Sequence, residues 1–262
     1  MLDITGWLGA QTWNFWQWGA LLLGGVGCGF VNTLAGGGSM ITMPLLIFLG
    51  LPPNEANATN RFALTFQYFI SALGFWTQGQ RDVQSLWKLV IPGLMGTALG
   101  SWFAILVDPA LFQTMLAILL LIVVIPVVFR KNTWIDQATE QKPSTSGWWL
   151  SLVFFGIGVY SGFIQIGVGI WSLLALLGMG GFSLNHANAI KAQLLCVYAL
   201  LATILFILHG QVWYGVAFGL AAANGVGAWI ATRVAYRYSL TWVRWLLLVV
   251  VLLSSMRLLG VF

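Results

Sequence analysis

The chain repeats itself across its midpoint. Gly79-Gln80 recurs as Gly210-Gln211, 131 residues later (210 − 79) in a chain of 262 residues. A glycine-broken apolar stretch, Gly29–Ser39, is echoed in the second half by Gly162–Trp171. In an apolar chain, duplicated hydrophobic segments interrupted at matching places predict a membrane protein built from two repeats, and they point to the interruptions as the place of a substrate site.

The composition requires a lipid environment. Hydrophobic residues make up 60% of the chain and charged residues only 6%, with a mean hydropathy of +0.91. Backbone polar groups in hydrocarbon must be satisfied internally, which leaves helices or closed barrels. Long apolar runs without period-two alternation favour helices, so we expect an all-α, polytopic membrane protein. The net charge of +5 comes from scattered residues, which argues against a nucleic-acid partner.

Each half divides into five apolar segments. They are expected at about Trp16–Leu34, Met40–Leu51, Ala56–Thr77, Trp87–Val107 and Ala110–Phe129, and then at Trp148–Gly167, Ile170–Met179, Ala187–Leu208, Trp213–Ala235 and Leu240–Leu259. The second segment of each half is too short to cross a hydrocarbon core of about 30 Å. We therefore expect a half-helix there, starting at the glycine break and packed inside the protein.

Positive charge predicts the orientation of the halves. We divide the chain into a first repeat (1–131), a polar cytoplasmic linker (132–147) and a second repeat (148–262). Basic residues gather in the linker and in two other connections, including Arg81, Lys88, Arg233 and Arg237. The positive-inside rule places all three in the cytoplasm, which requires inverted repeats and puts both termini outside. Parallel repeats with eight spans are the second alternative.

The glycine breaks are the first candidate site. The first consists of Gly36, Gly37, Gly38 and Ser39, and the second contains Gly167 and Gly169. Glycine allows a ligand to approach the backbone closely, and the N–H groups at a helix N-terminus attract anions. In the alternative interpretation these glycines only permit tight helix packing.

Two basic residues are the second candidate. Arg61 and Lys191 lie at matching places in the third segment of each half (191 − 61 = 130). Intramembrane cations normally face a cavity or a partner, although these two could instead snorkel to the headgroups. Polar residues nearby could complete a pocket, namely Asn32, Thr33, Asn60, Gln165 and Gln193.

At these residues the chain resembles a family. The run from Gly29 through Gly36-Gly37-Gly38-Ser39 to Thr59-Asn60-Arg61 is similar to the first-repeat signature of the TauE/SafE family of bacterial membrane permeases. Arg61 stands where that family usually has lysine, and Gln165-Ile-Gly-Val-Gly169 replaces a more glycine-rich turn. The resemblance covers nearly the whole chain. It implies movement of sulfite, sulfonates and related small anions across the cytoplasmic membrane.

These features together predict an anion transporter that works by alternating access. Export of a monoanion from a negative-inside cell is favoured by about 2.3 kcal/mol per 100 mV, so an exporter is expected. The expected partners are a small anionic substrate and the lipid bilayer, with a homo-oligomer left open. No cofactor, metal site or catalytic residue is expected, because the two histidines and two cysteines form no cluster. The alternatives are a membrane assembly or scaffold protein and an intramembrane enzyme.

Overall fold

The protein is helical throughout the residues that the structure describes. The computed structural model describes residues 13–79, 83–129, 147–234, 241–258 and 260. The helices in these ranges are α2 (Phe15–Ala35), α3 (Ser39–Phe48), α4 (Pro53–Thr77), α5 (Val83–Leu106), α6 (Pro109–Phe129), α7 (Gly147–Phe163), α8 (Val168–Gly178), α9 (Leu184–Leu208), α10 (Tyr214–Val234) and α11 (Thr241–Leu258). Each apolar segment predicted from the sequence is a helix, with ends within about four residues of the predicted ones.

Local sequence signals set several helix ends. Asn14 caps α2, since its side chain accepts from the Gln17 N–H at 3.0 Å while its own N–H donates to the Gln17 side chain at 2.9 Å. Gly36 ends the same helix in the left-handed conformation (φ 80°) that glycine adopts without strain. Pro53 opens α4, where a missing N–H costs nothing.

Four helices are long and apolar enough to cross a membrane by length and composition. They are α2, the part of α5 from Trp87 to Leu106, α9 and α10, within the described residues. Helix α4 is as long as α9 but more polar, because it carries a buried polar series that includes Asn57, Asn60, Arg61 and Gln67. Its polar face turns toward other helices, while large apolar side chains on its opposite face, such as Phe69 and Leu73, stay exposed.

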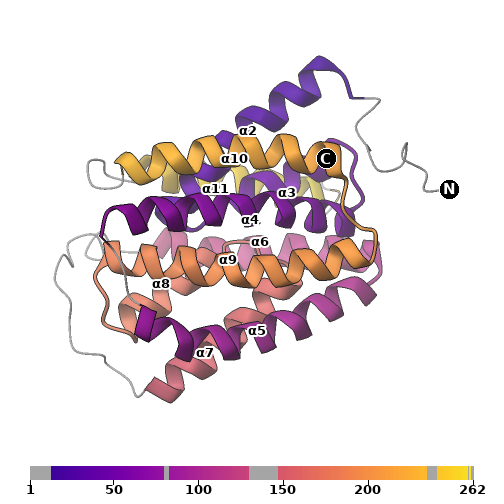
Figure 1. Cartoon of the computed structure of the whole chain (residues 1–262). Helices are drawn as coiled ribbons and strands as arrows, with labels where there is room; N and C mark the ends of the chain where they lie inside the picture. The colour runs from indigo at the N-terminus through magenta and orange to yellow at the C-terminus, as the bar shows by residue number, and fades with distance from the viewer. Residues whose placement is uncertain (1–12, 80–82, 130–146, 235–240, 259, 261–262) are drawn as a thin grey trace.

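Each half packs its helices mainly against helices of the other half. Helices α4 and α9 run side by side through the middle of the bundle, and Figure 1 shows them crossing it in opposite directions. Helix α2 of the first half packs mainly on α10 of the second, and α7 of the second half packs mainly on α5 of the first. This exchange is symmetric between the two halves. The orientation of each half relative to the two sides of the membrane stays a prediction.

Small residues allow these crossings to be close. A Cβ added to Gly29 of α2 would lie 2.0 Å from the carbonyl oxygen of Asn224 in α10. A Cβ on Gly100 of α5 would lie 2.0 Å from the carbonyl oxygen of Val159 in α7. Both crossings therefore bring backbone against backbone, as in other membrane helix pairs. The missing side chains of Gly29 and Gly100 are therefore what allows these helices to pack closely.

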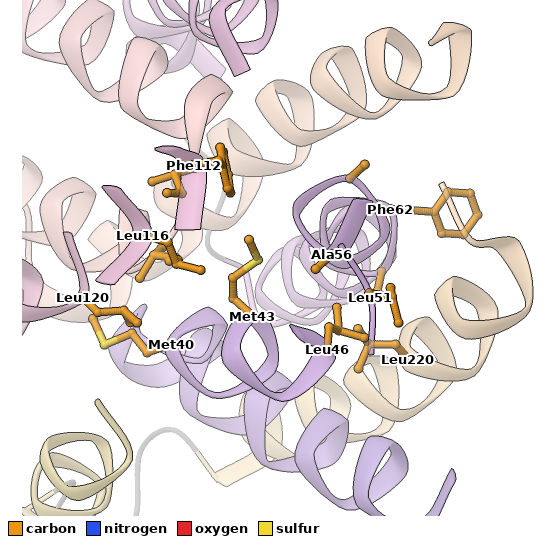
Figure 2. Packing of buried hydrophobic residues seen from close by; sticks show 14 of the residues in the cluster. Met40, Met43, Leu46, Leu51, Ala56, Phe62, Phe112, Leu116, Leu120 and Leu220 are labelled. Carbon is orange, nitrogen blue, oxygen red and sulfur yellow. The ribbon is translucent and has the colours of Figure 1, made fainter. Parts of the chain in front are cut away.

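Helix α3 is a buried half-helix, as the sequence predicted. Its 10 residues span only about 15 Å at the α-helical rise. Met40, Met43 and Leu46 are fully buried, and Figure 2 shows them packed between Leu116 and neighbouring residues of α6 on one side and Leu220 of α10 on the other. Helix α8, with 11 residues, is the matching element of the second half. The predicted linker 132–147 lies outside the described residues except for Gly147, which begins α7.

Candidate functional site

The two glycine breaks touch each other inside the protein. A Cβ added to Gly36, at the end of α2, would lie 2.3 Å from the carbonyl carbon of Gly169 in the first turn of α8. The converse is equally tight, because a Cβ on Gly169 would lie 2.4 Å from the Cα of Gly36. The sequence predicted the two breaks separately, and the structure joins them into one junction between the halves.

Ser39 fastens this junction. Its hydroxyl donates to the carbonyl oxygen of Gln165 at 3.2 Å and accepts from the N–H of Gly167 at 3.1 Å. Gln165 and Gly167 both have positive φ, of 57° and 61°, and Gln165 is the only non-glycine residue in the described ranges with that conformation. A left-handed glutamine is a strained backbone, held here by its surroundings.

The remaining glycines of the first break are in contact with protein. A Cβ on Gly38 would lie 2.1 Å from the carbonyl oxygen of Cys28. The N–H groups of Met40 and Ile41 donate to the carbonyl oxygens of Gly37 and Gly38, at 3.1 and 2.9 Å. Two donors at the start of α3 are therefore already used locally, and the missing side chain of Gly38 allows α3 to begin against α2 of the same half.

Lys191 closes the end of the broken helix α2. Its ammonium group donates to the carbonyl oxygens of Thr33 at 2.9 Å and Asn32 at 3.3 Å, and to the side chain of Asn188 at 2.7 Å. The last carbonyls of a helix have no partner within the helix, and a cation there also meets the negative end of the helix dipole. Lys191 of the second half therefore supports a helix of the first.

Arg61 makes the corresponding contact in the other direction. Its Nη1 donates to the carbonyl oxygen of Ser161 in the last turn of α7, and its guanidinium lies 5.2 Å from the centre of the Phe206 ring. The side chain is fully buried, and Lys191 is only 1% exposed. The snorkelling interpretation is therefore wrong for both cations. Unlike Nη1, the Nε and Nη2 atoms of Arg61 are buried without a hydrogen-bond partner.

A polar network joins α2 to α4 beside these cations. The Asn32 amide donates to Gln67 at 2.8 Å, the Gln67 amide donates to Thr33 at 3.4 Å, and the hydroxyls of Thr33 and Ser71 are 2.8 Å apart. Asn32 and Thr33 thus lie just ahead of the break, where they are bonded to α4. Because these bonds fix the end of α2, they hold the backbone carbonyls to which Lys191 donates.

Two other predicted residues have different surroundings. Asn60 accepts a hydrogen bond from Thr42 of α3 at 2.8 Å, so its side chain serves to position the half-helix. Gln193 is half-buried with its Nε2 lacking a partner, and no hydrogen bond within the described residues connects it to the junction. The described contacts of Asn60 and Gln193 therefore lie outside the junction itself.

Sequence reasoning missed several polar residues of this region. Gln67 and Asn188 hold Asn32 and Lys191 in place, Ser161 provides the carbonyl that meets Arg61, and Tyr68 is buried beside them. A signal for Asn188 was present, because Asn57 occupies the matching place 131 residues earlier (188 − 57) and donates to the carbonyl oxygen of Phe163 at 3.0 Å.

Two apolar grooves are present besides the junction. One of about 820 Å³ is formed by α4 and α10, around Phe66, Ile70 and Trp229. The other, of about 580 Å³, is formed by α6, α7 and α8 around Trp171. Arg61 and Lys191 line neither groove, so protein covers both cations. Within the described residues, no group of three His, Cys, Asp or Glu side chains is placed to hold a metal ion.

Comparison with known proteins identifies the family. The family model described as "Sulfite exporter TauE/SafE" matches residues 21–258, which is nearly the whole chain. The chain belongs to the sulfite exporter TauE/SafE family. The resemblance drawn from the glycine break and Arg61 is thereby confirmed, and the TauE/SafE match covers both halves and the junction between them.

Individual relatives of this TauE/SafE protein are named as membrane transporters. The chain is 27% identical over 221 residues to a probable membrane transporter protein of Haemophilus influenzae, covering 82% of this chain and 84% of that protein. It is 26% identical over 233 residues to one from a Sinorhizobium species, covering 88% of each, and 24% identical over 232 residues to the probable membrane transporter protein YfcA of Escherichia coli K12, covering 88% and 85%. No solved structure matches the chain. The protein is a membrane transporter.

Proposed function

We propose that this transporter moves small oxyanions such as sulfite or organic sulfonates, at a site beside the junction of the two glycine breaks. One observation supports the proposal above the others. Two broken helices from opposite halves meet at Gly36 and Gly169, and each half contributes one buried cation to that region, Arg61 and Lys191. Opposed broken helices with charged residues at membrane depth are a recurring design of substrate sites in secondary transporters.

Electrostatics favour an anion over a cation or a neutral solute. Helices α3 and α8 both begin at the junction, and a helix N-terminus carries a partial positive charge. Two buried basic side chains add to that potential, and an anion would offset the cost of holding them in the membrane. The two acidic residues that the structure describes are used at helix ends: Glu55 accepts from the Trp213 indole, and Asp108 accepts from the N–H of Ala110 at 2.9 Å.

Export is the direction that these charges favour. Anion movement out of a negative-inside cell gains about 2.3 kcal/mol per 100 mV, whereas uptake needs a coupled cation. Neither Glu55 nor Asp108 lies in the interior of a helix, where a proton-carrying carboxylate would be expected. We place the protein in the bacterial cytoplasmic membrane with both termini outside, with access alternating as the two halves rock about the junction.

Transport by purified protein tests the proposal. Vesicles containing the protein and preloaded with radiolabelled sulfite should release it faster when a potassium gradient with valinomycin makes their interior negative. Arg61→Gln should abolish the stimulated release, and empty vesicles give the background. Absence of protein-dependent flux of sulfite, a small sulfonate or acetate under either polarity would refute anion transport and favour the assembly or scaffold alternative.

A further inference from the structure

Helices α4 and α9 carry the same pair of side chains at matching places. Arg61 and Lys191 are 130 residues apart, and so are Tyr68 and Tyr198 (191 − 61 and 198 − 68). In each helix the tyrosine follows the cation by seven residues, which places both side chains on one face. All four side chains are buried, with at most 1% of their surface exposed. The sequence alone makes the two pairs equivalent.

On α9 both members of the pair are bonded to protein. Lys191 donates to Thr33, Asn32 and Asn188, and the hydroxyl of Tyr198 donates to the carbonyl oxygen of Leu89 at 2.6 Å. These contacts hold the end of α2 and the start of α5. This pair is therefore used for structure.

On α4 the same pair keeps unused donors. The Nε and Nη2 atoms of Arg61 and the hydroxyl of Tyr68 are buried without a hydrogen-bond partner. Two neighbouring residues share this property, since the hydroxyl of Ser161 and both amide atoms of Gln165 also lack partners while the residues are at most 2% exposed.

These unused groups lie together. Arg61 donates through Nη1 to the carbonyl oxygen of Ser161, so Ser161 lies next to the guanidinium, and its own hydroxyl is buried there without a partner. The hydroxyl of Tyr68 lies near Arg61 and faces the side chains of Asn32 and Gln165 without completing a hydrogen bond to either. The backbone at Gln165 is also strained, with its φ of 57°. Buried groups without partners and strained residues gather at functional sites.

The chemistry of the cluster matches an oxyanion. The outer edge of a guanidinium offers two parallel N–H donors that suit two oxygens of one anion, which an ammonium group cannot do. Two hydroxyls and an amide add donors for a third oxygen. A buried donor without a partner is costly, so a ligand that satisfies several at once gains from all of them.

We propose that the substrate oxyanion binds on the first-half side of the junction, held by Nε and Nη2 of Arg61, the hydroxyls of Tyr68 and Ser161, and the amide of Gln165. Lys191 and Tyr198 are positioning residues that hold broken or neighbouring helices and do not touch the ligand. The ligand class is a small anion with three oxygens on one centre, such as sulfite or a sulfonate. This inference rests on the proposed anion transport and assigns its binding residues.

The two tyrosines provide a matched test. Sulfite binding to the purified full-length protein is measured by isothermal titration, together with the thermal midpoint of each variant. Tyr68→Phe should weaken sulfite binding at least about tenfold, the effect of losing a hydrogen bond to a charged group, and leave the midpoint unchanged. Tyr198→Phe should leave sulfite affinity unchanged and lower the midpoint, because the Leu89 carbonyl loses its donor.

The results separate failure of the residue assignment from failure of the proposed anion transport. If wild-type protein binds sulfite and Tyr68→Phe binds it equally well, the assignment is overturned while anion transport stands. Equal losses of affinity in Tyr68→Phe and Tyr198→Phe overturn it too. If Tyr68→Phe elutes as aggregate, Ser161→Ala replaces it, with weakened binding expected and unchanged binding overturning the assignment. Failure of wild-type protein to bind sulfite or a sulfonate refutes the proposed function itself.

Discussion

The hydroxyl of Ser39 should be worth more to stability than any isolated serine in a membrane helix, because it joins the two halves. Replacing Ser39 by alanine removes the acceptor of the Gly167 N–H and the donor to the Gln165 carbonyl. That carbonyl still accepts the N–H of Val168 at 3.4 Å, so most of the cost falls on Gly167. A buried N–H without an acceptor costs about 1–3 kcal/mol.

We expect Ser39→Ala to lower the free energy of unfolding by about 2 kcal/mol, roughly a 30-fold change in the equilibrium constant. Ser172→Ala is the matched control. Ser172 lies on α8, the half-helix of the other repeat, and is equally buried, but its hydroxyl donates at 2.9 Å only to the carbonyl of Val168 one turn earlier. Such a bond adds little to stability, so this variant should behave like wild type.

Reversible unfolding in mixed detergent micelles with increasing dodecyl sulfate, followed by far-UV circular dichroism, measures both variants. Wild-type stability for Ser39→Ala would contradict the reasoning, because it would mean that Gly167 finds another acceptor. Equal destabilisation of Ser39→Ala and Ser172→Ala would also contradict it, since the contact between the halves would then have no special value.

Three further results are expected. Arg61→Gln should weaken sulfite binding by more than about tenfold, whereas Lys191→Gln should mainly lower the thermal midpoint, because its carbonyl partners on α2 lose their donor; titration and thermal melts compare the two. In a cysteine-free background, an impermeant maleimide applied to intact cells should label His209→Cys and spare Lys88→Cys, and equal labelling would exclude inverted repeats with both termini outside. Gly37→Val should still insert, because its Cβ would meet only the flexible ends of hydrophobic side chains, the nearest at 2.9 Å. It should not transport, because a side chain there blocks close approach of a ligand to the start of α3, and normal flux would remove this turn from the site.

The sequence was a good guide to the helices and to the half-helix α3. Segment length was enough to predict the half-helix, because Met40–Leu51 is too short to span the membrane and too apolar to lie in water. Charge was enough to pick out Arg61 and Lys191 as candidates, because basic residues inside apolar segments are rare. Both signals act locally, and so they can be read without knowing which segments meet.

The roles of Tyr68 and Tyr198 could not be predicted. Both tyrosines follow a cation by seven residues in an apolar helix, and only the packing of the helices gives one a carbonyl partner, that of Leu89, and leaves the other without one. The strain at Gln165 is likewise invisible in sequence, because glutamine rarely adopts a positive φ and nothing nearby requires it. Hydrogen-bond partners over long sequence separations depend on the whole fold.

The exchange of contacts between the halves links stability to transport. Helices α2 and α7 both end inside the bundle, and the carbonyl groups at each end are met by a cation from the other half, Lys191 for α2 and Arg61 for α7. Neither broken helix could remain in the membrane alone, because its last carbonyls would be unsatisfied. Lys191 performs this task with two hydrogen bonds and makes a third to Asn188 of its own helix, whereas Arg61 performs it with one nitrogen while its other two have no partner. Because the same guanidinium would hold α7 and the anion, binding of substrate would act directly on the contact between the halves.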